Sequence, residues 1–425
     1  MITLVLLGSF AVLLILGIPI SVSLGVSSIL ALLASGMGVG MIATNVFAAI
    51  SKFVLLAIPF FIVAGNIMEK TGISHRLINL AQAFVGHKRG GLPIVCVIVS
   101  CFFAAISGSG PATVAALGPI IIPAMVKAGY KASHTAALIA ITGAIGVIIP
   151  PSTSMVIYAS ITGVSVGKMF MAGIIPGILM GTLLAIEFIR ETKKDNIIML
   201  PKASNRERWI SLKESLAGLM MPVIILGGIY GGIFTPTEAA AVSAVYGLLV
   251  GVFIYKNVTF KMLYDIFVDS VAQSGVIMFI IACASLFAWV INVAGIGNLV
   301  QNAIVQFADG NWIVFMIIVN VTLLIAGCFI DVVSSFYIFT PIFYPIALQM
   351  GYDPILLGIV MVMNTAVGLA TPPVGANLYV ACSIADVSVL DISKRILGLV
   401  IVSAIALLLV TYIPQITLFL PGLMK

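Results

Sequence analysis

Charged side chains are scarce in this sequence. Asp, Glu, Lys and Arg make up 8% of its 425 residues and hydrophobic residues make up 62%, whereas soluble domains contain about 25% charged residues. The longest polar stretch, at about residues 190–214, is too short to fold by itself. The composition therefore predicts a polytopic membrane protein without a soluble domain of any size. The net charge of +6 is small and gives no case for nucleic-acid binding.

Sequence patterns for metal binding, redox chemistry and ATP hydrolysis are missing as well. The five cysteines lie in apolar segments and form neither a CxxC pair nor a Cys/His cluster, which predicts buried free thiols. The Walker pattern is absent, so the chain does not hydrolyse ATP by that route. No convincing pair of catalytic groups supports an enzyme such as an intramembrane hydrolase. The cysteines are Cys96, Cys101, Cys283, Cys328 and Cys382.

Two clusters of helix-breaking residues interrupt apolar sequence, at residues 107–111 (SGSGP) and 146–154 (GVIIPPSTS). In lipid, a broken backbone is tolerated where it is buried in protein or lines a cavity. Both clusters lie in a stretch that recurs: a shift of 222 residues from Ser109 to Tyr158 gives nine identities without a gap, four of them prolines. Paired, Gly/Pro-interrupted apolar segments in two halves of a chain indicate a transporter's binding site. Ordinary proline kinks in two unrelated membrane helices are the alternative.

Each copy of the repeat predicts a hairpin and a broken crossing. The first hairpin, at about 91–126, has two arms that are too short to cross the ~30 Å bilayer core, so it is expected to be re-entrant. Basic residues flank its open end, which predicts entry from the cytoplasm. The second hairpin, at about 312–349, has no Lys or Arg in its flanks and is expected to enter from outside. Broken crossings follow at 133–160 and 355–382. The predicted fold is thus an all-α membrane protein with two repeats of inverted topology. The basic residues beside the first hairpin are Lys88, Arg89, Lys127 and Lys131.

The expected organisation is a first repeat over residues 1–189, a basic cytoplasmic loop over 190–214 and a second repeat over 215–425. The N-terminal segment 3–34 reads as one long helix kinked at Gly17-Ile-Pro19, not as a removed signal. Thr235-Pro-Thr-Glu238 fits a capping box at the start of a helix. Nine crossings are expected, at about 3–34, 42–68, 133–160, 168–189, 216–234, 238–255, 270–293, 355–382 and 396–420. The loop contains seven basic residues, at positions 190, 193, 194, 202, 206, 208 and 213.

Asp331 is a carboxylate deep in an apolar run (LLIAGCFIDVVSSFYIF), where a bare charge costs about 2.5–3.5 kcal/mol. A bound cation would neutralise it; a protonated or hydrogen-bonded structural Asp is the alternative. Ser107 and Ser109 supply hydroxyls, and the breaks at Gly146–Pro150 and Gly368–Pro372 supply carbonyls that proline frees from helical pairing. These ligands suit a hard cation such as Na⁺ and not zinc or copper. Proton coupling is less favoured, because the histidines lie at loop edges.

Polar residues follow both proline pairs. Ser152, Thr153 and Ser154 come after the first pair and Asn377 after the second. They are expected at the start of a second half-helix, where free N–H groups and the helix dipole favour an anion. A carboxylate substrate would fit there, although Ser and Thr also commonly pack between membrane helices.

Three motifs in order, ISGSGPATVAALGPIIIPAM, GVIIPPS and GLATPPVGANLYV, resemble the large membrane subunit (the M, or DctM-like, subunit) of tripartite ATP-independent periplasmic (TRAP) transporters. These belong to the ion transporter superfamily. The resemblance covers essentially the whole chain. It implies an elevator-type secondary active importer in the bacterial inner membrane, which uses Na⁺ to drive uptake of a carboxylic acid, commonly a C4-dicarboxylate or sialic acid. Overall similarity favours the sialic-acid branch.

The resemblance also implies partners and site residues. The M subunit works with a small four-helix membrane subunit (Q) and a periplasmic substrate-binding protein (P). Some relatives fuse Q and M, and this chain is expected to be the unfused form. At least two Na⁺ sites are expected, and the Ser152 region matches the substrate side. The first Na⁺ site matches Ser107, Ser109 and Gly146. The second matches Asp331, Gly368, Ala370 and Pro372.

Two other functions remain open at this stage. A stand-alone Na⁺-coupled dicarboxylate carrier of the same superfamily would need no binding protein. A channel with two re-entrant loops would place its selectivity around a symmetric pore, whereas inverted hairpins predict one occluded site.

Overall fold

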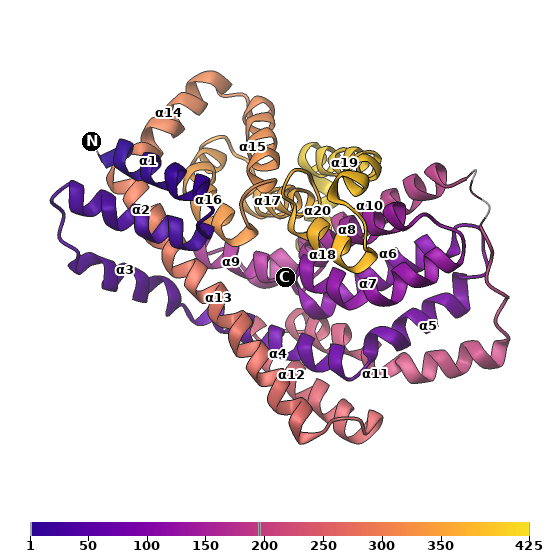
Figure 1. Cartoon of the computed structure of the whole chain (residues 1–425). Coiled ribbons are helices and arrows are strands. Elements are labelled where there is room, and N and C mark those ends of the chain that lie inside the picture. The colour runs from indigo at the N-terminus through magenta and orange to yellow at the C-terminus, as the bar shows by residue number, and fades with distance from the viewer. Residues whose placement is uncertain (1, 194, 196, 425) are drawn as a thin grey trace.

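The computed structural model describes residues 2–193, 195 and 197–424, and within these ranges every regular element is a helix (Figure 1). Lys194, one of the seven basic loop residues, lies outside the described residues. The first half contains α1 (Ile2–Ile15), α2 (Ile20–Ala34), α3 (Gly40–Ile50), η1 (Phe53–Leu56), α4 (Ala57–Lys70), α5 (Ile73–Val85), α6 (Gly91–Ser107), α7 (Gly110–Lys127), α8 (Ala132–Ile148), α9 (Thr153–Thr162) and α10 (Val166–Glu191). The second half contains α11 (Asn205–Tyr230), α12 (Pro236–Leu249), η2 (Val250–Tyr255), α13 (Phe260–Val293), α14 (Ile296–Ala308), α15 (Trp312–Gly327), α16 (Val332–Gln349), α17 (Pro354–Gly368), α18 (Ala376–Ala385), α19 (Val389–Tyr412) and α20 (Pro414–Gly422).

The helices confirm an all-α, multi-pass membrane fold. Eight described helices are long and apolar enough to cross a membrane, or up to nine if the bent pair α8 and α9 counts as one crossing. That pair bends by 40° at the break between Ile148 and Thr153. The break follows from the two prolines in it, since proline removes a backbone donor and clashes with the preceding turn.

The two halves correspond helix by helix around the hairpins. Helices α7 and α16 begin at residues 110 and 332, and α8 and α17 begin at 132 and 354, so both pairs are 222 residues apart. Contacts between the halves are exchanged in the same way: α7 packs on α18 while α16 packs on α9, and α8 packs on α19 while α17 packs on α10. Such an exchange is what two equivalent repeats produce when they pair. The boundaries of the repeats along the whole chain stay a prediction.

Each hairpin has a tip where the sequence contains turn-forming residues. In the first, α6 ends at Ser107, Gly108 follows with a left-handed backbone (φ 59°), and α7 begins after Ser109. In the second, Asp331 is the N-cap of α16. The second arms α7 and α16 have 18 residues each. They are longer than the sequence prediction of arms too short to cross allows, and they reach the length of a short crossing, so arm length alone does not make these hairpins re-entrant.

The expected single helix over residues 3–34 is wrong. Helices α1 and α2 are separated by a turn at Gly17 (φ 76°) and pack against each other, so the segment folds back as a helical pair. Gly17 adopts the left-handed conformation that glycine accepts without steric cost, and Pro19 then begins the new direction as the residue before α2. The sequence between 42 and 68 is likewise divided, into α3 and α4 joined by η1.

Further helices also differ from the sequence prediction. Helix α11 begins at residue 205 instead of about 216, because Ser204 and Glu207 form a capping box at its start. The final helix begins at residue 389 and is divided into α19 and α20 before Pro414. Helix α14, which matches α5 in the other half, was not expected at all. The capping box predicted at Thr235 and Glu238 is confirmed.

Helix α13 is the longest element, with 34 residues and therefore a length of about 51 Å. It exceeds the ~30 Å bilayer core, so it either tilts or extends beyond the core at its start, where Lys261, Asp265 and Asp269 are exposed. Figure 1 shows it as a long diagonal rod, and α2, α3 and α4 pack along it. Helix α13 flanks the hairpins and contributes one wall of the cavity described below.

Candidate functional site

A cavity of about 250 Å³ lies where the two hairpin tips meet the flanking helices α4 and α13. Both tips line it, as do the beginning of α9 and the residues on either side of the second break. One cavity thus joins elements that are more than 200 residues apart in sequence. Its polar side chains are Asn66, Glu69, Ser107, Ser109, Thr153, Ser154, Gln273 and Asp331.

The first hairpin tip is held by a compact set of hydroxyl contacts. Ser107 Oγ lies 2.9 Å from Thr113 Oγ1, and Thr113 Oγ1 donates to the Ser109 carbonyl at 2.8 Å. Gly146 of α8 lies directly against this tip, since a Cβ built there would be 2.7 Å from Thr113 Oγ1 and 3.1 Å from the Ser109 carbonyl oxygen. The structure therefore brings together Ser107, Ser109 and Gly146, whose role as cation ligands stays a prediction.

Asp331 lines the cavity from the second tip and also caps α16. Its Oδ1 accepts from the Ser334 N–H at 2.9 Å and its Oδ2 from the Ser334 hydroxyl at 2.6 Å. A carboxylate at a helix N-terminus is stabilised by the helix dipole. The hydrogen-bonded structural role considered for Asp331 is thus present, and each carboxylate oxygen keeps a further lone pair for another ligand.

Of the residues expected to form the second ion site, only Asp331 lines the cavity. Gly368 lies against the backbone of Gly327 at the end of α15, so it contacts the second hairpin. Ala370 is buried and Pro372 is half-buried in the segment between α17 and α18. Neither Ala370 nor Pro372 lines the cavity.

The four expected substrate residues divide into two groups. Thr153 and Ser154 line the cavity, and Thr153 donates to the Gly108 carbonyl at 3.2 Å, which links α9 to the first tip. Ser152 is fully buried and donates to the Val147 carbonyl at 2.6 Å. Asn377 is fully buried outside the cavity lining and donates to the Ala140 carbonyl at 2.9 Å, so it joins α18 to α8.

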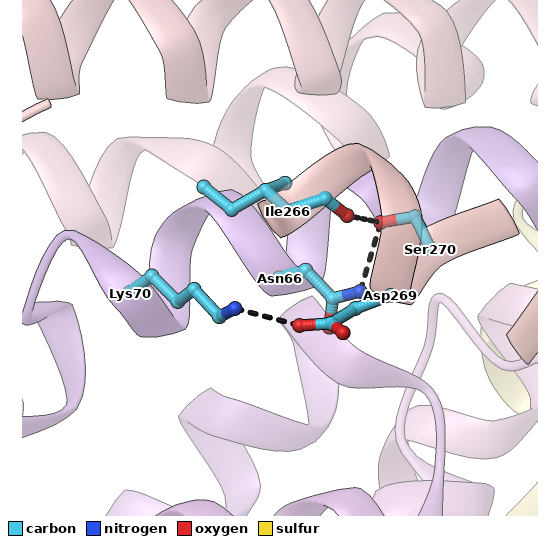
Figure 2. A network of polar contacts seen from close by, with 5 residues as sticks. All are labelled: Asn66, Lys70, Ile266, Asp269 and Ser270. Atoms are coloured by element: carbon cyan, nitrogen blue, oxygen red, sulfur yellow. Dashed lines mark hydrogen bonds and ion pairs between the residues drawn. The ribbon is translucent and has the colours of Figure 1, made fainter. Parts of the chain in front are cut away.

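Three polar residues of the cavity were missed from the sequence. Asn66 and Glu69 of α4 share one helix face, and Gln273 comes from α13. Figure 2 shows the adjoining network: Asn66 Nδ2 donates to Ser270 Oγ at 2.8 Å, and Lys70 pairs with Asp269 at 2.6 Å. Glu69 and Lys70 had the appearance of a charged loop edge, because they follow a long apolar run.

The cavity lining contains two carboxylates and no Lys, Arg or His among the described residues. The described part of the chain also has no group of three or more His, Cys, Asp or Glu that could hold a metal ion. Hydroxyl, amide and carboxylate oxygens with backbone carbonyls are the ligands of hard cations. The first turn of α9 could bind an anion, because backbone N–H groups at a helix N-terminus have no helical partners.

The open ends of the two hairpins differ in chemistry. At the first, Arg89 donates to the Lys193 carbonyl at 2.6 Å and the Ile198 N–H donates to the Ala128 carbonyl at 2.8 Å, so the basic loop lies against this end. At the second, the Trp312 ring lies 5.8 Å from Tyr352 and 6.0 Å from Tyr412. Basic loops and aromatic side chains are typical of membrane–water interfaces.

Comparison with known proteins identifies the family. Residues 7–416 match the model of the family described as the tripartite ATP-independent periplasmic transporter, DctM component. The chain is 40% identical over 436 residues to the C4-dicarboxylate TRAP transporter large permease protein DctM of Rhodobacter capsulatus, with 99% of each chain covered. It is 35% identical over 408 residues to the sialic acid TRAP transporter large permease protein SiaM of Vibrio cholerae, with 96% of this chain and 95% of that protein covered.

Two further comparisons concern chain organisation and fold. The chain is 40% identical over 420 residues to the isethionate TRAP transporter permease protein DctMQ of Oleidesulfovibrio alaskensis. The matched region covers 98% of this chain but 66% of that protein. The solved structure of the YdaH transporter of Alcanivorax borkumensis gives a TM-score of 0.63 at 13% identity, over 90% of this chain and 88% of that one, and so has the same fold. This chain belongs to the large permease (DctM) components of TRAP transporters, a family of transport proteins and not of enzymes.

Proposed function

We propose that this permease is the transport subunit of a Na⁺-coupled importer for a carboxylic acid of the sialic-acid or C4-dicarboxylate type. The observation that carries the proposal is the single cavity bounded by both hairpin tips and by the start of α9. A site formed at the interface of two repeats by interrupted helices is typical of secondary transporters.

Two groups of residues are proposed to bind Na⁺. Ser107, Ser109 and Gly146 form the first group at one tip, where hydroxyl and carbonyl oxygens converge. The second group is supplied by the second tip and break. Na⁺ bound there would neutralise the Asp331 carboxylate, which no basic side chain of the described cavity lining can pair with. The second group comprises Asp331, Gly368, Ala370 and Pro372.

The substrate carboxylate is proposed to bind at the first turn of α9, where Thr153 and Ser154 add hydroxyls to free backbone N–H groups. Ser152 and Asn377 would support this site, because each donates to a carbonyl of α8 and fixes the chain around a break. Substrate at this place would contact the moving hairpins and the flanking helices together, which suits an elevator mechanism.

In this proposal the open end of the first hairpin lies at the cytoplasmic side of the bacterial inner membrane, because the basic loop near Lys193 lies against it. The Trp312 cluster would then face the periplasm. The inverted orientation of the repeats follows from that assignment. The chain would take its substrate from a periplasmic binding protein (P) and work with a small membrane subunit (Q). The part of the DctMQ relative beyond this chain would correspond to Q.

Uptake of labelled substrate into proteoliposomes tests the proposal. The vesicles contain this chain with its Q partner, and the binding protein is added outside with and without an inward Na⁺ gradient. Uptake of sialic acid or succinate that requires both additions is expected. Robust uptake without the binding protein would favour the stand-alone carrier, and uptake without Na⁺ would remove the cation sites and direct attention to a protonatable Asp331.

A further inference from the structure

Helix α4 contributes two hydrogen-bond acceptors to the cavity wall, the amide oxygen of Asn66 and the carboxylate of Glu69. The neighbouring groups that could donate to them, the Ser270 hydroxyl and the Lys70 ammonium, are bound to other residues. Ser270 has a single hydroxyl hydrogen, which it donates to the Ile266 carbonyl at 2.6 Å (Figure 2). Its oxygen can therefore only accept in its 2.8 Å contact with Asn66, so the Asn66 NH₂ group must be the donor. This contact fixes the orientation of the amide, and Oδ1 is left as the acceptor.

Glu69 lies three residues further along the same face of α4 and also lines the cavity. Lys70, the adjacent cation, is engaged with Asp269 at 2.6 Å across to α13. In the described chain no basic side chain lies within ion-pairing distance of Glu69. The wall thus combines a carboxylate with an amide oxygen, and both of these accept hydrogen bonds, while the second N–H of Asn66 Nδ2 is the only donor that the two side chains add.

We propose that Asn66 and Glu69 bind hydroxyl groups of the substrate, so that this permease selects hydroxylated monocarboxylates over C4-dicarboxylates. The inference rests on the proposed function, because it takes the cavity to be the substrate site. One carboxylate of the substrate has a favourable place at the α9 N-terminus. A second carboxylate would face the Glu69 carboxylate with no cationic side chain in the described lining, and only the amide N–H groups of Asn66 and Gln273 could donate to it. Hydroxyl groups can instead donate to the Glu69 carboxylate and to Asn66 Oδ1.

The test compares a dicarboxylate that has no hydroxyl groups with hydroxylated monocarboxylates. Succinate and threonate (2,3,4-trihydroxybutanoate) share a four-carbon chain, and threonate carries hydroxyls in place of the second carboxylate. N-acetylneuraminate serves as a larger hydroxylated monocarboxylate. Binding of each acid is titrated calorimetrically, in Na⁺ buffer, to the purified chain in complex with its Q subunit, so that the binding protein does not select the substrate. At least one hydroxylated acid is expected to bind about tenfold or more tighter than succinate, because a site built for hydroxyls discriminates strongly against analogues without them.

Glu69→Gln is the decisive variant. It replaces one acceptor oxygen with an NH₂ donor that a second carboxylate can accept from, so the preference for the hydroxylated acid over succinate should fall about tenfold. Asp265→Asn makes the same charge change on the exposed part of α13, outside the cavity lining, and should leave the preference unchanged. Tighter binding of succinate by the unmodified chain, with no change in Glu69→Gln, would overturn the inference while leaving Na⁺-coupled transport intact.

Two other outcomes are distinguishable. In the first, Glu69→Gln changes the Na⁺ concentration required for binding but not the preference among acids. That result would mean that Glu69 binds a cation and not a substrate hydroxyl, and it would overturn the inference. If none of the three acids shows Na⁺-dependent binding, the proposed function itself fails and the inference fails with it.

Discussion

Gly327 and Gly368 meet backbone to backbone, because a Cβ built on Gly368 would lie 2.6 Å from the Cα and carbonyl carbon of Gly327. Through this contact the second hairpin packs directly against the end of α17, where the break before α18 begins. The matching glycine in the other half, Gly146, instead faces Thr113 Oγ1 and the Ser109 carbonyl of the first hairpin. Both hairpins thus approach their broken helices at a position where a larger residue would intrude.

Replacement of Gly368 by alanine should destabilise the protein by about 1–3 kcal/mol, because the added methyl group meets backbone that cannot move aside. The midpoint of thermal unfolding in detergent measures the effect. Gly275→Ala is the matched control, since the position is helical and has nothing within 4 Å of a new Cβ. Equal unfolding midpoints for Gly368→Ala and the control would contradict this account of the contact.

Asp331 has two separable roles, and two substitutions distinguish them. Asp331→Ala removes both the carboxylate and the N-cap of α16, which costs about 1 kcal/mol of stability. Asp331→Ser keeps a capping oxygen but removes the charge. Both variants are expected to lose Na⁺-dependent uptake in proteoliposomes, with the assembled complex intact, and only Asp331→Ala should unfold at lower temperature. Normal uptake with normal Na⁺ dependence in Asp331→Ser would exclude Asp331 as a cation ligand.

The sequence predicted those features that depend on local backbone chemistry. The hairpin tips and the breaks at Pro150 and Pro372 could be located because adjacent proline and glycine residues disrupt helical hydrogen bonding together, whereas the isolated prolines inside α7 and α16 leave those helices continuous. The turn at Gly17 was read as a kink, since apolar periodicity does not distinguish a bent helix from one that reverses. The early start of α11 did have a signal, because Ser204-x-x-Glu207 is the same capping pattern that was recognised at Thr235.

Long-range pairing could not be predicted in this way. Asn66 and Ser270 are 204 residues apart in sequence, and the repeat does not relate them. Glu69 appeared to be a loop residue because charge follows an apolar segment there, yet α4 continues through Lys70 and brings it to the cavity. Which polar residues share a cavity depends on how the helices pack, and helix packing is not local.

Two buried asparagines should be important for the stability of the second half. Asn364 donates to Asn320 Oδ1 at 2.8 Å, and Asn320 donates to Thr411 Oγ1 at 3.2 Å, so α15, α17 and α19 are joined inside the protein. Asn320→Leu should cost about 1–3 kcal/mol, because a buried polar partner is removed from both contacts. Thermal unfolding in detergent measures the loss. Asn45→Leu is the control and should unfold close to the unmodified protein, because this half-buried asparagine of α3 donates only to the Met41 carbonyl of its own helix.

The start of α11 offers a prediction about local order. Ser204 Oγ accepts from the Glu207 N–H at 3.2 Å, and Glu207 Oε2 accepts from the Ser204 N–H at 2.6 Å. Ser204→Ala breaks the first of these contacts and should cost about 1 kcal/mol, mainly as fraying of the first turn. Hydrogen–deuterium exchange of the peptide that contains Glu207 should therefore accelerate, while peptides from α8 stay unchanged. Ser204→Asp keeps a capping oxygen and should restore slow exchange. If Ser204→Ala exchanged as slowly as the unmodified chain, the Arg208 contact with the Ala83 carbonyl at 3.1 Å, and not the cap, would hold this end of the helix.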